Sequence, residues 1–305
     1  RGGGISINVI QNIKFIRYGG VRGVLRGDNG GDGGTYLVSD CEFNANTTPI
    51  IAKTFGDATN HTVVNRCKFT ENTTNLVLPA GDMFCDFINC VFGLKAGVEG
   101  INFGNLNVNG TVQNCSFVAN VDTSGAHIIQ AGVIENNVIQ SLSTTSAQVI
   151  GIKAHSSRSN NATFGNFATD QTGGTNGGNN LEGQDPLFTD TTLDNPDLSI
   201  PSNSPLVDAG KTIAAITVDF NGVTRPQNAN YDIGAFEAKV WSDILDDDPF
   251  RRKFGSNTFE IRSTKNNLRQ RRFREALNNR QAPFSLTLPG PPSIRGKTKP
   301  YKTEE

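Results

Sequence analysis

Residues 40–48 read DCEFNANTT, and close copies of this phrase return further along the chain. The copies read RCKFTENTT at 66–74, NCVFGLKAG at 89–97 and NCSFVANVD at 114–122. Their cysteines are 26, 23 and 25 residues apart, and a fifth copy follows 22 residues later with Asn137 in place of cysteine. A unit of this length that recurs in register is typical of a solenoid, in which each copy buries its apolar face against its neighbours.

Two positions of the unit are expected to point into the core. The cysteine and the residue two places later share one face of a strand, because side chains alternate along a strand. The residue directly before the cysteine is polar, and we place a tight corner there, where Asn tolerates a left-handed backbone. Stacked coils then form one ladder of Cys41, Cys67, Cys90 and Cys115 and another of Phe43, Phe69, Phe92 and Phe117.

The composition agrees with an all-β fold, since the 305 residues include 33 Gly but one Met and one Trp. We predict a right-handed, single-stranded parallel β-helix with a C-terminal cap and an extended basic tail. The coils occupy 1–178, with further copies around 12–16 and 161–167, the capping segment occupies 179–238, and a basic, Pro-containing extension occupies 239–305. A β-sandwich, the rival fold, explains alternating strands but gives no reason for residue identity to recur in register.

Several motifs resemble those of known β-helix proteins. F-x-x-N occurs at 43–46, 69–72 and 117–120, and GGGI stands at 2–5. Later come NNLEGQDPLF (179–188), PDLSIPSNSPLVDAGK (196–211), DFNGVTRP (219–226) and YDIGAFE (231–237). Across residues 1–238 this succession resembles bacterial β-helix proteins of the polymorphic outer-membrane and choice-of-anchor Q type. The resemblance implies a secreted, cell-surface or phage-borne protein, and it implies no shared active site.

We interpret 179–238 as a cap, because an uncovered last coil exposes strand edges and an open core. Asp232 is a candidate ion-pair partner for Arg225 within this segment. The sequence DFNG is interpreted as a β-turn whose Asp219 caps local N–H groups; the alternative, a calcium loop, is short of oxygen ligands. The residues expected to plug the open end are Leu187, Phe188, Leu198, Ile200, Leu206, Val207, Ile233 and Phe236.

No catalytic, cofactor-binding or metal-binding residue is predicted. Nucleotide-binding, zinc-protease and serine-hydrolase motifs do not occur in the sequence, and His61, His127 and His155 fall at unrelated points of the repeat. The five cysteines are interpreted as small buried thiols. The second hypothesis is a tailspike-like polysaccharide lyase or glycoside hydrolase. A glycoside hydrolase would need two carboxylates that converge on the scissile bond. The candidate carboxylates for such a pair are those of the segment 27–34 and those of Asp82, Asp86 and Asp122. The third is a glycan-binding module without turnover.

The tail differs from the rest of the chain in charge. Residues 251–305 hold 14 of the 28 Lys and Arg but 4 of the 29 Asp and Glu. We interpret 239–305 as an arm that binds protein partners in a larger assembly, since a purely solvating tail has little use for aromatic residues. A solvated disordered extension and a nucleic-acid-binding tail are the alternatives. The candidate partner-binding residues are Phe250, Phe254, Phe259, Arg271, Arg272 and Phe273.

These features favour a non-enzymatic structural or adhesive protein located in the extracellular space, at the cell surface or on a virion. The expected partners are proteins that bind the tail, with surface glycans as a further class. Neither nucleic acid nor a cofactor is expected. The sequence has no apolar run long enough to span a bilayer.

Overall fold

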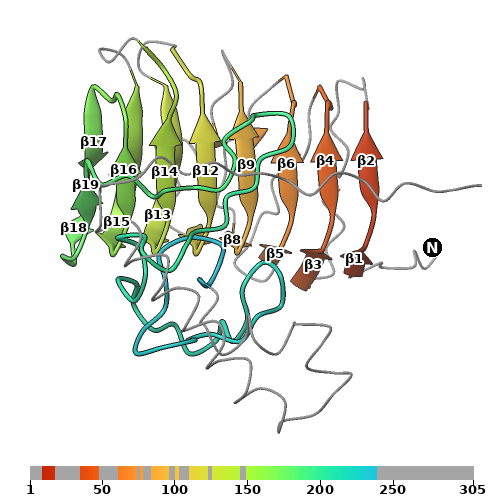
Figure 1. The fold of residues 1–305 in the computed structure, drawn as a ribbon. Coiled ribbons are helices and arrows are strands. Elements are labelled where there is room, and N and C mark those ends of the chain that lie inside the picture. The colour runs from red at the N-terminus through yellow and green to blue at the C-terminus, as the bar shows by residue number, and fades with distance from the viewer. Residues whose placement is uncertain are drawn as a thin grey trace, which may run out of the picture. The chain divides into compact units, whose positions relative to one another are not determined.

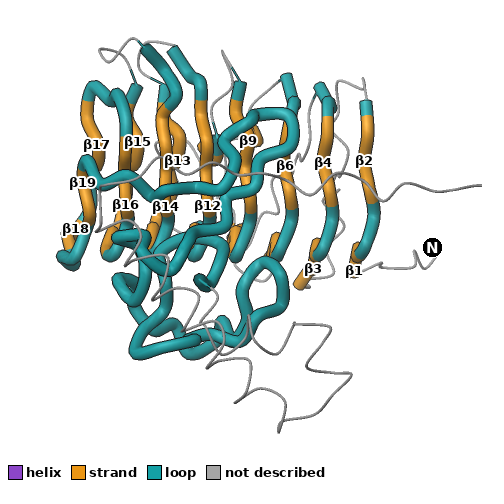
Figure 2. Tube along the Cα trace, in the orientation of Figure 1, coloured by secondary structure: helices purple, strands orange, loops and turns teal. Residues whose placement is uncertain are grey.

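The computed structural model describes residues 9–17, 35–47, 61–73, 76–77, 84–95, 100–102, 110–122, 126–144 and 149–238. These residues form strands, turns and loops, with no helix among them (Figure 2). No helix within the described ranges could therefore cross a membrane. The whole of the predicted extension at 239–305 lies outside the described residues.

Two sheets make up the fold, and the strands of each pair in parallel with those of the neighbouring coils (Figure 1). The 11-stranded sheet contains β1 (Val9–Gln11), β3 (Thr35–Ser39), β5 (His61–Asn65), β7 (Leu76–Val77), β8 (Phe84–Ile88), β10 (Ile101–Asn102), β11 (Thr111–Gln113), β13 (His127–Glu135), β15 (Ile150–Ser159), β17 (Thr169–Thr172) and β18 (Thr175–Asn176). The 8-stranded sheet contains β2 (Lys14–Ile16), β4 (Glu42–Asn44), β6 (Lys68–Thr70), β9 (Val91–Leu94), β12 (Ser116–Ala119), β14 (Val138–Ser141), β16 (Ala162–Phe164) and β19 (Leu181–Glu182).

The order of the 8-stranded sheet follows the order of the chain, from β2 to β19. Each coil therefore adds one strand to this sheet and stacks on the coil before it, as the row of strands in Figure 1 shows. This arrangement confirms the predicted parallel β-helix. The coils expected around 12–16 and 161–167 are present as β2 and β16.

The phenylalanine side chains form a continuous stack inside the coils. Successive rings of Phe15, Phe43, Phe69, Phe92 and Phe117 have centroids 4.4–4.9 Å apart and planes within 11° of parallel. This spacing is close to the distance between hydrogen-bonded strands, so identical residues in register bring equal rings into contact. Phe15 extends the ladder by one coil at its N-terminal end, and Ile139 lies next to Phe117 at the other end.

Cysteine and asparagine share a second interior column. Each of Cys41, Cys67, Cys90 and Cys115 directs its thiol at a backbone carbonyl of the preceding coil, with Sγ···O distances of 3.5–3.8 Å. Asn137 and Asn161 make the same contact with their amide groups at 2.8 Å. The column therefore continues through the coils where asparagine replaces cysteine, because both side chains donate to the equivalent carbonyl of the preceding coil.

The residue before this column turns the corner between the two sheets, as predicted. Asp40, Arg66, Asn89 and Asn114 have φ values of 51–54°, in the left-handed region. The same conformation occurs at Asn12, Asn136, Asn160 and Asn179. Asparagine tolerates it, whereas arginine adopts it at a cost. At Arg66 a two-point ion pair with Asp40 of the neighbouring coil, at 2.7 and 2.9 Å, accompanies the unfavourable backbone.

Residues 183–238, named here the returning segment, run as loop along the outside of the coils (Figure 2). Two apolar clusters hold them there. Val91 and Val118 of the sheet pack with Leu198, Ala235 and Phe236, and a second group joins the same sheet to the segment. That group comprises Val138, Ala162, Ile200, Leu206, Ile233 and Ala238.

Seven of the eight predicted cap residues therefore pack along the side of the coils instead of plugging the open end, and the eighth, Leu187, is 38 % exposed. Contacts with the returning segment reach back as far as Lys68, whose ammonium donates to Asn195 Oδ1 at 2.8 Å and to the Pro196 carbonyl at 3.0 Å. The approach is close at Gly93, where an added Cβ would lie 2.2 Å from the Leu193 carbonyl oxygen. The apolar residues of the segment cover apolar positions on the outer face of the 8-stranded sheet.

Candidate functional site

The predicted ladder residues all lie in the interior of the coils. Cys41, Cys67, Cys90 and Cys115 are free thiols with at most 2 % of their surface exposed, and Cys85 is also free and buried. Burial raises the pKa of the Cys67, Cys85 and Cys90 thiols above its usual value. A protonated thiol that solvent cannot reach is a poor nucleophile and a poor metal ligand. These cysteines pack the core and stabilise the coils.

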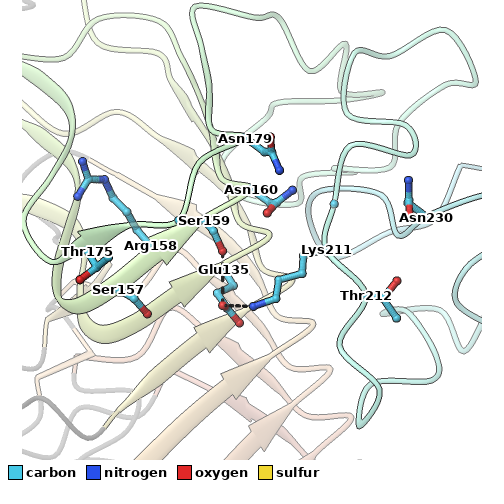
Figure 3. Close-up of a pocket in the computed structure, with 12 residues that line it drawn as sticks. Glu135, Ser157, Arg158, Ser159, Asn160, Thr175, Asn179, Lys211, Thr212 and Asn230 are labelled. Atoms are coloured by element: carbon cyan, nitrogen blue, oxygen red, sulfur yellow. Dashed lines mark hydrogen bonds and ion pairs between the residues drawn. The ribbon is translucent and has the colours of Figure 1, made fainter.

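A polar pocket of about 540 Å³ lies where the last described coils meet the returning segment (Figure 3). Glu135 and Ser159 come from the ends of β13 and β15, and Lys211, Thr212 and Asn230 face them from the returning segment. None of its twelve lining residues has a large apolar side chain. The other lining residues are Ser157, Arg158, Asn160, Thr175, Gly177, Asn179 and Gly210.

An ion pair stands at the centre of the pocket. Lys211 Nζ lies 2.8 Å from Glu135 Oε1, and the side chains are 52 % and 13 % exposed respectively. The Glu135 carboxylate also accepts hydrogen bonds from Ser159 Oγ at 3.4 Å and from Gln113 Nε2 at 3.1 Å. The two charges are therefore fixed in place while Lys211 keeps an open face toward solvent.

Hydrogen bonds from the asparagines that turn the corners between the two sheets fix the backbone around Lys211. Asn136 accepts a hydrogen bond from the Lys211 N–H and donates one to the Lys211 carbonyl, both at 2.7 Å. The Asn160 amide donates to the Ala209 carbonyl at 2.9 Å, and that of Asn89 to the Val218 carbonyl at 2.9 Å. The asparagines that turn the corners thus also dock the returning segment, which forms one wall of the pocket.

Four side chains in the pocket have unused hydrogen-bonding capacity. In the part of the chain that the structure describes, the side chains of Ser157, Thr175, Asn179 and Thr212 form no hydrogen bond with the protein. Together they offer three hydroxyl groups and one amide group around the ion pair. A ligand with several hydroxyl groups finds donors and acceptors on both walls.

Sequence reasoning missed this pocket. Glu135 and Lys211 are 76 residues apart, and no local motif connects them. The one signal available was the column of polar residues before the cysteine, to which Asn160 and Asn179 belong. That column predicted a corner, but it held no information about which later segment would pack beside it.

The candidate carboxylates from the coils do not form a catalytic pair among the described residues. Asp86 Oδ2 lies 2.7 Å from His61 Nε2, and its other oxygen accepts the Thr111 N–H at 3.2 Å. Asp122 accepts a hydrogen bond from Ser143. Both carboxylates therefore connect neighbouring coils. Residues 27–34 and Asp82 lie outside the described residues.

A buried charged network holds the returning segment together. Arg225 pairs with Glu237 at 2.7 Å and donates to the backbone carbonyls of Asp232 and Gly234. The expected partner, Asp232, instead accepts the N–H groups of Asp208 and Ala238 with its carboxylate. Asp219 accepts the N–H groups of Asn221 and Val223 at 2.8 Å, as the β-turn interpretation predicted.

Glu237 and Asp219 also line a second pocket of about 300 Å³. Burial raises the pKa of Glu237 to about 7, because its loss of hydration outweighs the attraction to Arg225. Burial also raises the pKa of Asp232. Both oxygens of each of Asp219 and Glu237 already accept hydrogen bonds within the returning segment.

The raised pKa of Glu237 predicts a pH dependence of stability. A glutamate in the unfolded chain has a pKa of about 4.3, so between that value and pH 7 the folded protein binds one more proton at this site. The free energy of unfolding is therefore expected to fall as the pH rises through this window, by on the order of 2–3 kcal/mol. Chemical denaturation at pH 5 and pH 8 measures the difference. Glu237→Gln should flatten it, and an equal slope in both proteins would contradict the assignment.

The six candidate residues of the tail, from Phe250 to Phe273, lie outside the described residues, so their role as a partner-binding arm stays a prediction. The stacking of the coils brings the ladder residues together. The residues of the polar pocket come together because the returning segment packs beside the coils. No protein-family model, no curated protein and no solved structure matches this chain.

Proposed function

We propose that this chain is a non-enzymatic structural or adhesive β-helix of the polymorphic outer-membrane or choice-of-anchor Q type, displayed outside the cell or on a virion. The observation that carries this proposal is the continuous interior stack. Phe43, Phe69, Phe92 and Phe117 are at most 1 % exposed, as are the thiols of Cys67, Cys90 and Cys115. A coil filled in this way offers its outer face and its loops for contact with other molecules.

Residues 239–305 serve in this proposal as the arm that attaches the β-helix to its assembly. The support comes from composition. Residues 251–305 hold 14 of the 28 basic residues, and residues 1–250 carry more acidic than basic side chains. A basic segment with interspersed phenylalanines suits an acidic surface on a partner protein, where charge guides the encounter and aromatic rings anchor it.

Deletion of residues 251–305 tests the proposal. The shortened protein is expected to fold, with an unchanged thermal unfolding transition, because the described coils and the returning segment end at residue 238. It is expected to be lost from the surface or particle fraction of the organism that carries it. A shortened protein that is incorporated as well as the full chain would refute the role of the arm.

A glycoside hydrolase is the second candidate, because Asp219 and Glu237 line one pocket and the pKa of Glu237 is raised. These are the properties of an acid paired with a carboxylate. Against it, Asp219 is 1 % exposed and Glu237 5 % exposed, and their oxygens bind the chain itself. Incubation of the full chain with capsular and cell-wall polysaccharides separates the two functions. New reducing ends that disappear with Glu237→Gln would establish the hydrolase.

A further inference from the structure

The polar pocket beside β13 and β15 has the dimensions of a small-molecule site. Its volume of about 540 Å³ falls within the usual range for ligand pockets, about 300–1,000 Å³. Most such pockets are largely apolar, and this one is lined by hydroxyl, amide and charged groups. The lining therefore selects for the chemistry of the ligand more strongly than the volume does.

The charges of the pocket disfavour ionic ligands. The lining holds two cations and one carboxylate, and each cation already has a partner: Lys211 pairs with Glu135, and Arg158 donates to the Gly173 carbonyl. An inorganic anion would have to compete with these partners, and a divalent cation would be repelled by both cations. Within the described residues no cluster of His, Cys, Asp or Glu has the arrangement of a metal site. An apolar ligand finds no apolar wall against which to bury its surface. The ligand that fits is polar and uncharged.

The free side chains specify the hydrogen bonds that such a ligand would make. A carboxylate and an ammonium group 2.8 Å apart present an acceptor beside a donor, which matches two neighbouring hydroxyl groups of a sugar ring. Asn179 from the coil side and Thr212 from the returning segment add an amide and a hydroxyl on opposite walls (Figure 3). Each sugar hydroxyl both donates and accepts hydrogen bonds, so the hydroxyls of one sugar ring together can pair with the donors and the acceptors of the pocket.

We propose that this pocket binds a neutral, hydroxyl-rich saccharide unit. The proposal deepens the adhesive function proposed above and rests on it, since it names the class of surface ligand. Glu135 accepts from one sugar hydroxyl, Lys211 donates to the neighbouring one, and Asn179 and Thr212 bind the far edge of the ring. The Asn136 contacts position Lys211 and do not touch the sugar.

The test is binding of the full chain to an array that carries neutral and acidic oligosaccharides, followed by calorimetry with the strongest neutral oligosaccharide. Two variants remove pocket groups and leave the backbone undisturbed. Asn179→Gly deletes the amide at a position whose φ is 55° and which glycine adopts freely, and Thr212→Val deletes an exposed hydroxyl. Each is expected to weaken binding about fivefold, the effect of one neutral hydrogen bond. Lys95→Met, which removes the ion pair with Glu71 outside the pocket, is the matched control.

Neutral oligosaccharides that bind the wild type and the Lys95→Met protein equally, and both pocket variants more weakly, would support the proposal. The absence of neutral binding, stronger binding of acidic sugars, or equal binding by all variants would overturn it. The chain without residues 251–305 is expected to keep saccharide binding. If the full chain binds no neutral saccharide, the result contradicts only the proposal for the pocket. If the shortened chain is incorporated normally, the result contradicts only the proposal for the arm.

Discussion

Phe92→Ala is expected to lower the free energy of unfolding by about 3–5 kcal/mol, the usual cost of removing a buried phenylalanine. Phe92 is 0 % exposed and stacks on Phe69 and Phe117, with ring centroids 4.8 and 4.4 Å away. Its replacement leaves a cavity between two coils that the stacked backbone cannot close. Denaturant unfolding of the variant and the wild type measures the loss.

Phe15→Ala is the matched control for this prediction. Phe15 belongs to the same stack, with its ring 4.9 Å from that of Phe43, but it lies at the end of the ladder and is only partly buried. Its replacement is expected to cost less than half as much. Equal losses at Phe92 and Phe15 would mean that the rings do not act as a continuous interior stack.

Arg225→Met is expected to destabilise the returning segment by about 3–5 kcal/mol, the cost of removing one partner of a buried ion pair. The side chains of Arg225 and Glu237 are 0 % and 1 % exposed. At pH 8, above the pKa of about 7 that Glu237 has beside Arg225, loss of the arginine forces the buried carboxyl group to stay charged without a counter-ion or to take up a proton. The carbonyls of Asp232 and Gly234 also lose their donor. Hydrogen exchange of amides in 205–237 measures the effect in the segment itself.

The double variant Arg225→Met with Glu237→Leu provides the control. It removes both charges and replaces them with apolar groups, and such replacement of a buried pair is often neutral. The part of the loss that comes from the unpaired carboxylate is therefore expected to be recovered, whereas the backbone groups that Arg225 and Glu237 bind stay without these partners. A double variant as unstable as the single one would show that packing of the arginine, and not its charge, holds the segment.

The coil architecture could be predicted because every unit repeats the same local requirements. A small donor side chain at Cys41 and its equivalents, a ring at Phe43 and its equivalents, and a left-handed corner at Asp40 and its equivalents are properties of single positions. Because these three requirements recur at the same positions of every unit, a parallel stack of coils is the arrangement that satisfies them together. The same rule correctly placed a coil at 12–16, although Ile13 stands there in place of cysteine.

The placement of the returning segment could not be predicted from its own residues. Its apolar side chains require a surface to cover, and both the open end of the coils and the side of the sheet satisfied that requirement. A signal did exist on the coils. The outward residue after the column is Glu42 or Lys68 in the early coils and Val91, Ser116, Val138 or Ala162 in later ones, so charged side chains give way to small or apolar ones.

The pocket depended on this placement and was therefore missed as well. Its two walls come from 135–179 and 210–230, and they meet because Asn136 and Asn160 bind the backbone at Lys211 and Ala209. The pairing of Arg225 was missed for a similar reason. Asp232 is nearer to Arg225 in sequence, but it meets the guanidinium with its backbone carbonyl, whereas Glu237 brings a carboxylate oxygen to within 2.7 Å.

Equivalent positions of successive units lie in contact, one coil above the next. Cross-linking of Lys14→Cys with Glu42→Cys tests this stacking most directly, since these residues are paired between β2 and β4 and carry an ion pair at 2.6 Å. Paired residues of adjacent strands are about 4.8 Å apart, within the range that a disulfide spans. Oxidation of the folded protein should link positions 14 and 42, and a variant with cysteines at 14 and 68, two coils apart, should stay unlinked. Absence of the 14–42 bond, or equal linkage of 14 with 68, would contradict the stacked coil.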